Sequence, residues 1–527
     1  MSSKPNVILI LNDDMGYSDI GCYGGEVDTP NLNKLANGGV RMSQFYNTAR
    51  CCPTRASLLT GLHPHQAGVG HMMQDLGEDG YQGDLKSATA TIPEVLKSAG
   101  YKSYMSGKWH ITRFTDGEKQ HSWPMQRGFD KFEGLLDGCS NFFYPHMWHI
   151  GNENVTEDVW KTDGFYTTDA IADNACKYID EHCVESKDEP FFLYTAFTAP
   201  HWPLNAKEED IEKYKGKFSE GWDVLREKRL ERMKKMGLVA EDLQLSARDP
   251  KVCAWEDEPD KAWRERCMEV YAAQIDCMDQ GIGRMLDTLE KNNQLENTIV
   301  IFLADNGGCA EEFAPGKCHR KATQPFLPDG REVAYGNDHN VMPGSADTYQ
   351  SYCTPWANLS NTPFREYKHW VHEGGIATPF IVHWPKGLKN AGSIVHKPGQ
   401  LTDVMATLVD VSGATYPLQK NGEEIPACEG FSLMNILQND EDNGREFLVW
   451  EHEGNKAIRD GKYKAVSKHL KGWELYDIES DRSETNNIAD QKGNMVRDLA
   501  ARWNNWADRV GAKEFETLIY NNFKRGK

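Results

Sequence analysis

The segment Asn47–Gly61, with the sequence NTARCCPTRASLLTG, places the thiols of Cys51 and Cys52 directly before Pro53. Proline is favoured in the first turn of a helix, so both thiols are expected at a helix N-terminus. Unpaired amides and the helix dipole favour negative charge there, and Arg55 follows Cys51 by about one turn. The pattern indicates either a thiol of low pKa braced by a cation, or two buried cysteines before an ordinary helix. The longer phosphate loop that separates Cys from Arg in a cysteine phosphatase is absent.

Two pairs of oxygen-bearing side chains follow apolar runs. Asp13 and Asp14 end the run NVILILN, and Asp305 and Asn306 end the run NTIVIFLA. Either pair alone is more often a turn or a helix cap, but two pairs at matching strand ends favour a metal site. Oxygen ligands suit a hard cation, and calcium fits a crowded, irregular site better than magnesium.

Further candidates are a lysine and histidine in GKWH, a histidine in APHWPL and a lysine before an EGG sequence. Lys108 and His110 lie on an extended stretch, where alternate side chains face the same way. His201 lies between prolines, and Lys368 precedes Glu373 by five residues. Judged singly, each of these is an ordinary surface or loop residue.

Strand-like and helix-like segments alternate along most of the chain. Buried strands are expected at NVILILND, PFFLYTAF, NTIVIFLAD and ATPFIVHWP, with a helix after Thr29, its expected cap, and an amphipathic helix over 271–289. This alternation predicts an α/β fold with a large, mostly parallel sheet covered by helices on both faces. Ligands bind at the carboxyl ends of strands in such sheets, and the acidic pairs, Lys108 and His201 all fall at or just beyond such ends.

The chain divides into two predicted units. Residues 1–439 form the larger predicted unit, which contains all the candidate residues above, with a charged, solvated helical insertion at about 205–250 and a long loop at about 309–361. Residues 440–527 read as antiparallel strands followed by a helix, which is a smaller α+β subdomain. The long loop, with Trp356, and residues 141–164 are expected to shape the pocket.

The net charge of the chain limits the macromolecules that it is expected to bind. The chain of 527 residues has 79 acidic and 59 basic side chains and a net charge of −20, so neither nucleic acid nor an anionic membrane is expected as a partner. No signal peptide or membrane span is evident, which predicts a cytoplasmic protein as written. An exported protein whose signal was trimmed is the alternative, and Cys309 and Cys318 are then candidates for a disulfide.

The motif C-x-P-T-R-A-S-L-L-T-G, beginning at Cys51, resembles the signature of type I sulfatases. NDDMGYSDIGCYGG, SGKWHI, APHWPL, ADNGG and YKHWVHEGGIATP also occur in the family order, and the chain is similar to bacterial arylsulfatases. The resemblance implies an alkaline-phosphatase-like fold and hydrolysis of sulfate monoesters. It also implies a maturation enzyme that oxidises Cys51 to formylglycine (3-oxoalanine), and one calcium ion per chain.

The resemblance further assigns roles within this site. Hydrolysis would proceed through a covalent sulfo-enzyme intermediate, with Asp305 as the nearest candidate base. His369 and His372 are not matched and are taken as ordinary residues. The implied calcium ligands are Asp13, Asp14, Asp305, Asn306 and formylglycine 51, and the implied catalytic set is Arg55 (activation), Lys108 and Lys368 (sulfate binding), His110 (formylglycine turnover) and His201 (leaving-group protonation).

Two other functions use the same residues. A phosphonate monoester or phosphodiester hydrolase of the same superfamily would share the aldehyde and the metal. A non-catalytic binder of sulfated glycans would retain the residues without maturation. Aryl sulfates, sulfated sugars and small alkyl sulfates are all compatible substrates.

Overall fold

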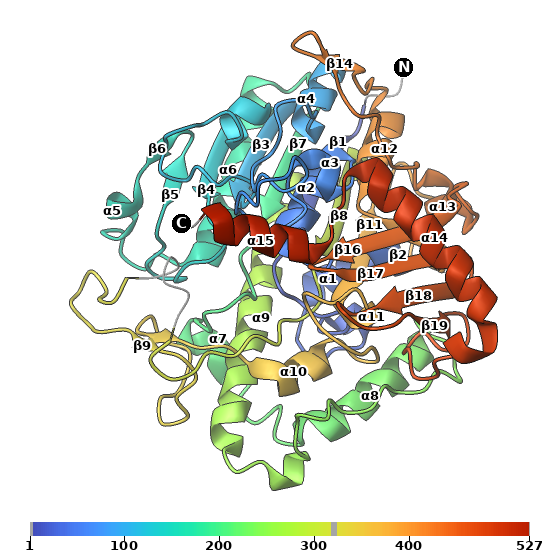
Figure 1. The fold of residues 1–527 in the computed structure, drawn as a ribbon. Coiled ribbons are helices and arrows are strands. Elements are labelled where there is room, and N and C mark those ends of the chain that lie inside the picture. Colours follow the sequence, from blue (N-terminus) through green and yellow to red (C-terminus); the bar gives the residue numbers. More distant parts are fainter. Residues whose placement is uncertain (1–3, 318–323, 526–527) are drawn as a thin grey trace.

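The computed structural model describes residues 4–317 and 324–525, and one large mixed sheet runs through its centre (Figure 1). Within these residues the sheet has 11 strands, and β13 pairs with β2 beside the main order β12-β2-β11-β8-β1-β7-β3-β4-β5-β6. The strands are β1 (Asn6–Asn12), β2 (Val40–Tyr46), β3 (Lys102–Gly107), β4 (Lys131–Leu135), β5 (Trp148–Ile150), β6 (Glu153–Asn154), β7 (Phe191–Ala196), β8 (Thr298–Ala304), β11 (Ala377–His383), β12 (Ile394–Val395) and β13 (Gly399–Gln400).

The centre of the sheet is parallel, as the sequence predicts. β8, β1, β7, β3 and β4 run in the same direction, whereas β11 is antiparallel to both β8 and β2. Leu11 of β1 lies level with Ala196 of β7 and Leu303 of β8, and Ala196 lies level with Gly107 of β3. Four neighbouring strands therefore end at one level, and the residues that follow them meet at one edge.

The central strands are apolar on both faces, and helices cover both faces of the sheet. In β1, Ile8 and Ile10 join one core, and Val7, Leu9 and Leu11 join the other. The first core takes residues from α1 (Pro30–Gly38), α6 (Thr167–Glu185), α7 (Glu208–Glu212), α8 (Gly221–Met236), α9 (Lys261–Lys291), α10 (Cys353–Ser360) and α11 (Glu373–Ile376). The second takes residues from α2 (Cys51–Thr60), α3 (Pro64–Ala67), α4 (Ile92–Leu96), α12 (Thr402–Ser412) and α13 (Met434–Asn439).

Helix α1 begins at Pro30 as predicted, but its cap differs. The hydroxyl of Thr29 accepts a hydrogen bond from the Gly21 amide and caps nothing. The Asp279 carboxylate of α9 instead accepts from the amides of Asn31 and Leu32 at 3.0 and 2.8 Å. A carboxylate distant in sequence thus satisfies the free amides of this helix.

The charged segment at 205–250 packs more closely than the predicted solvated insertion. It contains α7 and α8, and Trp222 and Met233 of α8 are buried. Arg229 is fully buried and pairs with Asp19 at 2.9 Å and Glu26 at 2.7 Å. Its guanidinium contacts the loop after β1, so the insertion is helical as predicted but is buried on one side and not solvated throughout.

The predicted loop at 309–361 is also not a loop throughout. It contains the short strands β9 (Ala334–Tyr335) and β10 (Thr348–Tyr349), and α10 occupies its end. Trp356 of α10 is fully buried and packs edge-on against Trp222, so the prediction that it shapes the pocket was wrong. The candidate disulfide between Cys309 and Cys318 lies outside the described residues.

A second, four-stranded antiparallel sheet forms the C-terminal part, as predicted. One of its faces packs on α14 (Gly493–Val510) through Trp503 and Trp506, and the other joins the first core through Trp450. α15 (Phe515–Arg525) follows, and the remaining two-residue strands are β14 (Gln419–Lys420) and β15 (Glu423–Glu424). The four strands, in order across the sheet, are β16 (Phe447–His452), β17 (Asn455–Asp460), β18 (Tyr463–Ser467) and β19 (Glu474–Asp477).

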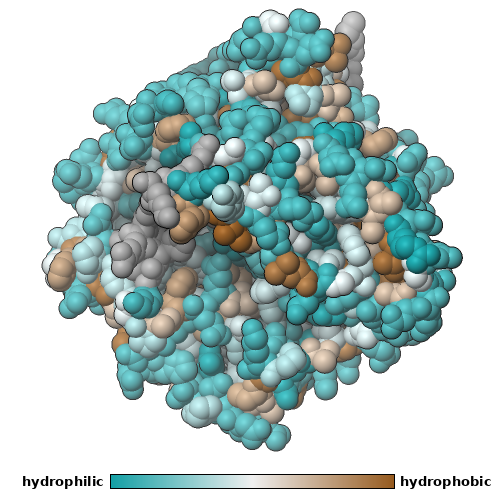
Figure 2. Space-filling view, viewed as in Figure 1, coloured by the Kyte–Doolittle hydropathy of each residue, from teal (hydrophilic) through white to brown (hydrophobic). Residues whose placement is uncertain are grey.

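Figure 2 shows one face of the molecule, where hydrophilic residues predominate and hydrophobic ones form small, separate spots. Within the described residues, the helices are all too short or too polar to cross a bilayer.

A buried charge network joins this second sheet to the part of the chain that forms the large sheet. Glu373 of α11 pairs with Lys464 of β18 and with Arg482, both at 2.9 Å, and Lys464 also pairs with Glu484 at 2.9 Å. Burial raises the pKa of Glu373, but the surrounding Lys464 and Arg482 outweigh it and lower that pKa to about 2. The carboxylate is therefore ionised and fixes the turn between Lys368 and β11.

We expect Lys464→Met to lower the free energy of unfolding by about 3–5 kcal/mol, because it leaves buried carboxylates without their cation. The matched control is Lys34→Met, which breaks a 2.7 Å pair with Glu290 whose side chains are 55% and 48% exposed. That exposed pair should contribute no more than about 1 kcal/mol. Urea unfolding of both variants measures the difference, and equal shifts would contradict the role given to the network.

Candidate active site

The polar residues named from the sequence converge at the aligned strand ends. Asp13 and Asp14 follow β1, Asp305 follows β8, and Lys108 follows β3. Because these strands are neighbours that end level with one another, their first loop residues share one buried space. His201 reaches it from the loop after β7, Cys51 from the start of α2, and Lys368 from the turn before α11.

Helix α2 begins at Cys51, two residues before the predicted start at Pro53. Both thiols therefore lie within its first turn, and both are buried. A hydrogen bond from Cys52 lowers the pKa of the Cys51 thiol well below its usual value, against burial, and His110 and Lys108 lower it further. The site thus stabilises negative charge at position 51.

Two buried cations, Arg55 and Lys108, contact the carboxylates of this space. Arg55 donates from Nη2 to Asp305 Oδ2 at 2.8 Å and from Nη1 to the Lys108 carbonyl at 2.9 Å. The Lys108 ammonium pairs with Asp13 Oδ2, to which Arg55 Nη2 is 3.6 Å away. These side chains are fully buried, so their charges interact strongly with one another.

The acidic residues leave oxygen atoms free for a cation. Asp13 Oδ1 and Asn306 Oδ1 are buried and have no hydrogen-bond partner among the described residues. Burial raises the pKa of Asp13, and burial together with the Asp13 charge raises the pKa of Asp305 to about 8. A hard cation held by Asp13, Asp14, Asp305 and Asn306 would relieve both effects, so this donor set fits calcium.

On the other side of Asp14, a lysine and a histidine come together. Lys368 Nζ lies 2.7 Å from Asp14 Oδ1, and His201 Nε2 lies 3.3 Å from Asp14 Oδ2. Burial raises the pKa of Asp14, but His201 and Lys368 outweigh this and lower it. Lys368 Nζ and His201 Nε2 are 3.4 Å apart, while His201 Nδ1 donates to the Trp202 carbonyl at 2.6 Å. That bond leaves the Nε2 lone pair facing the site.

His110 lies on the thiol side of the space. Its Nε2 is 3.3 Å from Cys52 Sγ, and burial lowers its pKa to about 4, so it is neutral at pH 7. A Cβ on Gly138 would lie 2.3 Å from His110 Nε2, so only glycine leaves room for the ring at that position. The sequence offered no sign of this constraint.

A cavity of about 1150 Å³ opens from this space. It is lined by Cys51, His110, His201 and Lys368, and also by residues of the segment 141–164, as predicted. Arg50 and Glu311 also line it and pair at 3.0 Å. Glu311 belongs to the segment 309–361, which was predicted to shape the pocket, but neither residue was named individually as a site residue.

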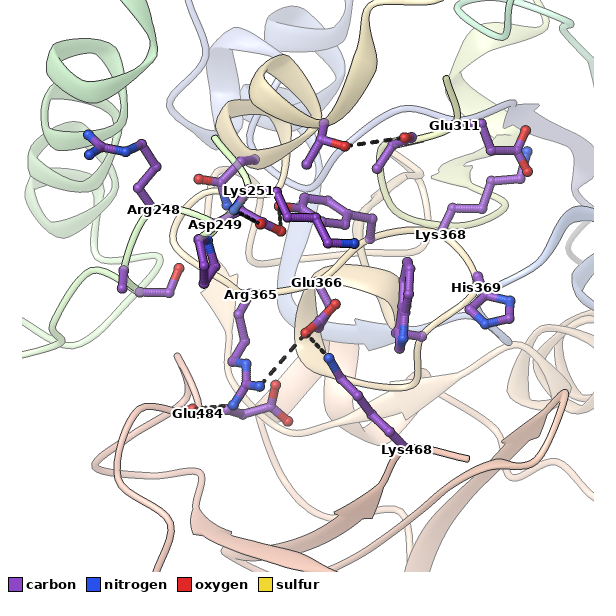
Figure 3. A pocket seen from close by; sticks show the side chains of 18 of the residues that line it. Arg248, Asp249, Lys251, Glu311, Arg365, Glu366, Lys368, His369, Lys468 and Glu484 are labelled. Carbon is purple, nitrogen blue, oxygen red and sulfur yellow. Dashed lines mark hydrogen bonds and ion pairs between the residues drawn. The ribbon is translucent and has the colours of Figure 1, made fainter. Parts of the chain in front are cut away.

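A second cavity of about 890 Å³ adjoins the first, and the two share Arg50, Glu311 and Lys368. Figure 3 shows its wall, where Glu366 lies between Arg365 and Lys468 and pairs with both. The other labelled basic side chains are Arg248, Lys251, Lys368 and His369. Acidic side chains line the same cavity, so its wall carries both signs of charge; they are Asp249, Glu311, Glu366, Glu453 and Glu484.

The chain matches known proteins over nearly its whole length. Residues 5–414 match the family model "Sulfatase", and residues 365–506 match "N-sulphoglucosamine sulphohydrolase, C-terminal". An uncharacterized sulfatase of Schizosaccharomyces pombe is 33% identical over 95% of this chain and 93% of its own. The arylsulfatase of Klebsiella aerogenes is 34% identical over 78% of this chain and 87% of its own.

Solved structures share the fold. The crystal structure of Ps i-CgsB in complex with k-i-k-neocarrahexaose has a TM-score of 0.67 and 24% identity, and covers 96% of this chain and 93% of that one. With the family match spanning most of the chain and the strand-end site intact, this protein belongs to the sulfatase family and is a sulfuric ester hydrolase.

Proposed function

We propose that this protein removes sulfate from carbohydrate sulfate monoesters, using formylglycine made from Cys51 and one calcium ion. The observation that carries the proposal is the position of Cys51. It begins α2 beside Lys108 and Arg55, and it lines the cavity into which a substrate would pass. A maturation enzyme that oxidises Cys51 is part of the proposal.

The chain's own residues support each component. Asp13, Asp14, Asp305 and Asn306 would hold calcium, which when bound supplies positive charge against the sulfate oxygens. Formylglycine supplies, when present, an aldehyde hydrate with one oxygen as nucleophile and a second hydroxyl for sulfate release. His110, neutral at pH 7, can accept a proton beside position 51.

Lys108, Arg55 and Lys368 orient and stabilise the sulfuryl group. Their charges lie in a buried space, where preorganised cations stabilise a developing anion far better than water does. Lys368 Nζ can donate a hydrogen bond to the free lone pair of His201 Nε2, and both residues line the cavity. In this proposal Lys368 passes a proton to Nε2, and His201 delivers that proton to the leaving oxygen.

A carbohydrate substrate is supported by the size and lining of the cavities. A cavity of about 1150 Å³ exceeds the needs of a simple aryl sulfate, and Trp160 and Trp202 provide aromatic surface within it. The adjoining cavity is lined by charged and polar side chains of both signs, which suit the hydroxyl groups of a longer carbohydrate. Among similar proteins, a Bacteroides thetaiotaomicron protein 25% identical over 92% of this chain and 83% of its own is named N-acetylglucosamine-6-O-sulfatase.

Sulfate specificity can be tested by comparing kcat/KM for an aryl sulfate and an aryl phosphodiester. The protein should be produced with a formylglycine-generating enzyme, and mass spectrometry should verify position 51. We expect a clear preference for the sulfate and no turnover in Cys51→Ala, because the nucleophile is lost. The mature protein should also release inorganic sulfate from a sulfated oligosaccharide.

Each alternative gives a different result. Preference for the diester would indicate a phosphodiesterase-type activity. An aldehyde at position 51 with no turnover of either ester would favour a non-catalytic glycan binder. Release of sulfate from aryl esters alone would contradict the carbohydrate part of the proposal.

We expect His201→Gln to lower kcat/KM for an alkyl or sugar sulfate by about 10²–10⁴-fold, because an alkoxide leaves poorly without a proton. Nitrophenyl sulfate should lose much less, since nitrophenolate leaves without protonation. The matched control is His146→Gln, which lines the same cavity beside Ser140 but does not contact Lys368. Equal losses on both substrates in His201→Gln would show that His201 binds sulfate without donating a proton.

A further inference from the structure

Four side chains gather at the seam between the second sheet and the catalytic part, separate from the strand-end site. Glu453, in the turn between β16 and β17, lies at their centre. Its Oε1 is 2.7 Å from His71 Nε2 and 3.7 Å from His452 Nε2, and its Oε2 is 3.1 Å from His369 Nδ1. These four residues form the seam cluster.

His452 is the member whose surroundings are incomplete. Its side chain is fully buried, and neither ring nitrogen has a hydrogen-bond partner among the described residues. A neutral imidazole carries a free lone pair on one ring nitrogen, and that nitrogen is the atom that binds a metal. A buried imidazole without a partner costs free energy, which an ion between His452 and Glu453 would offset.

The backbone holds two cluster members in an uncommon conformation. His369 has a φ of 93° and Glu453 a φ of 49°, both in the left-handed region that residues other than glycine rarely adopt. The His369 amide is fixed by a 2.8 Å hydrogen bond to the Ala49 carbonyl. Such strain persists where the surrounding structure must aim a side chain, and here it aims both toward the same point.

We propose that the seam cluster binds one transition-metal ion, with Zn²⁺ as the best fit. One ligand atom each from His369, His452 and Glu453 lies within 4.8 Å of the others, and His71 contacts the same carboxylate. Three imidazoles and one carboxylate match the tetrahedral nitrogen-and-oxygen coordination that zinc favours. Calcium prefers an all-oxygen set, so the two sites would select different ions.

The position of the cluster gives the ion a structural role. His452 and Glu453 belong to the hairpin of the second sheet, whereas His71 and His369 belong to the catalytic part. His369 directly follows Lys368, so an ion here would fix that lysine's turn against the hairpin. His369 and Glu453 also line the second cavity, and Figure 3 shows His369 at its edge, which provides access for the ion.

The competing interpretation is that Glu453 merely pairs with His71 and His369, at 2.7 and 3.1 Å. That network satisfies Glu453 but leaves both ring nitrogens of His452 without a hydrogen-bond partner among the described residues. An ion accounts for all four residues.

Metal binding can be measured directly on the full-length protein after treatment with a chelator and return to buffer with excess Ca²⁺. We expect one equivalent of Zn²⁺ per chain by elemental analysis, and Co²⁺ substitution should give the visible absorption of a tetrahedral site. His452→Gln and Glu453→Gln should weaken Zn²⁺ binding by at least about 100-fold. The matched control is His65→Gln. The buried ring of His65 pairs at 2.8 Å with Glu451, which precedes His452 on β16, and this variant should retain the ion.

A second preparation tests whether zinc binds instead at the cysteine and histidine cluster beside the active site. Cys51, Cys52 and His110 also lie within metal-binding distance of one another, so the titration should be repeated in Cys51→Ala. Zinc at those thiols would give a sulfur-to-cobalt charge-transfer band and would be lost in that variant. If His452→Gln does not fold, His71→Gln and His369→Gln decide, because their side chains are partly exposed. No stoichiometric Zn²⁺, or unchanged affinity in the foldable cluster variants, would overturn the proposal.

Discussion

The active site depends on the balance of buried charge at the ends of four parallel strands. Asp13, Asp14 and Asp305 are buried together, and Arg55, Lys108 and Lys368 offset their formal charges. A divalent ion added to this balanced set leaves the space net positive, which favours a sulfate ester over neutral ligands. Because the groups are held by strand ends and by α2, little reorganisation is needed when an anion binds.

The second sheet stabilises this arrangement from outside. Glu373 and Lys464 join α11 to β18 through a fully buried ion pair, and the seam cluster lies where the β16–β17 hairpin meets the turn of Lys368. Both contacts act on the short stretch between Lys368 and β11. The C-terminal part of the chain thus contributes to the position of Lys368, the lysine proposed to bind sulfate.

Local patterns explain why much of the fold and site was predictable. Fully apolar runs identified the central strands, and polar residues at their ends had to meet once the strands were parallel, as Asp13 and Asp305 do. Features that depend on distant partners were not predictable. Asp279 replaces Thr29 as the cap of α1, Trp356 turns into the core, and the seam cluster joins residues separated by more than 300 positions. None of these contacts leaves a pattern within one segment.

The central claim is that the buried charges at the strand ends hold a calcium ion. The most direct test is a crystal structure of the matured protein, from crystals grown with calcium and with anomalous scattering measured. We expect a single calcium ion at the strand ends, within about 2.3–2.6 Å of Asp13 Oδ1 and Asn306 Oδ1, which have no hydrogen-bond partner among the described residues. The carboxylates of Asp14 and Asp305 should complete its protein ligands. The account would be contradicted if, at saturating calcium, no anomalous peak lay there and Lys108 and Lys368 alone neutralised Asp13 and Asp14.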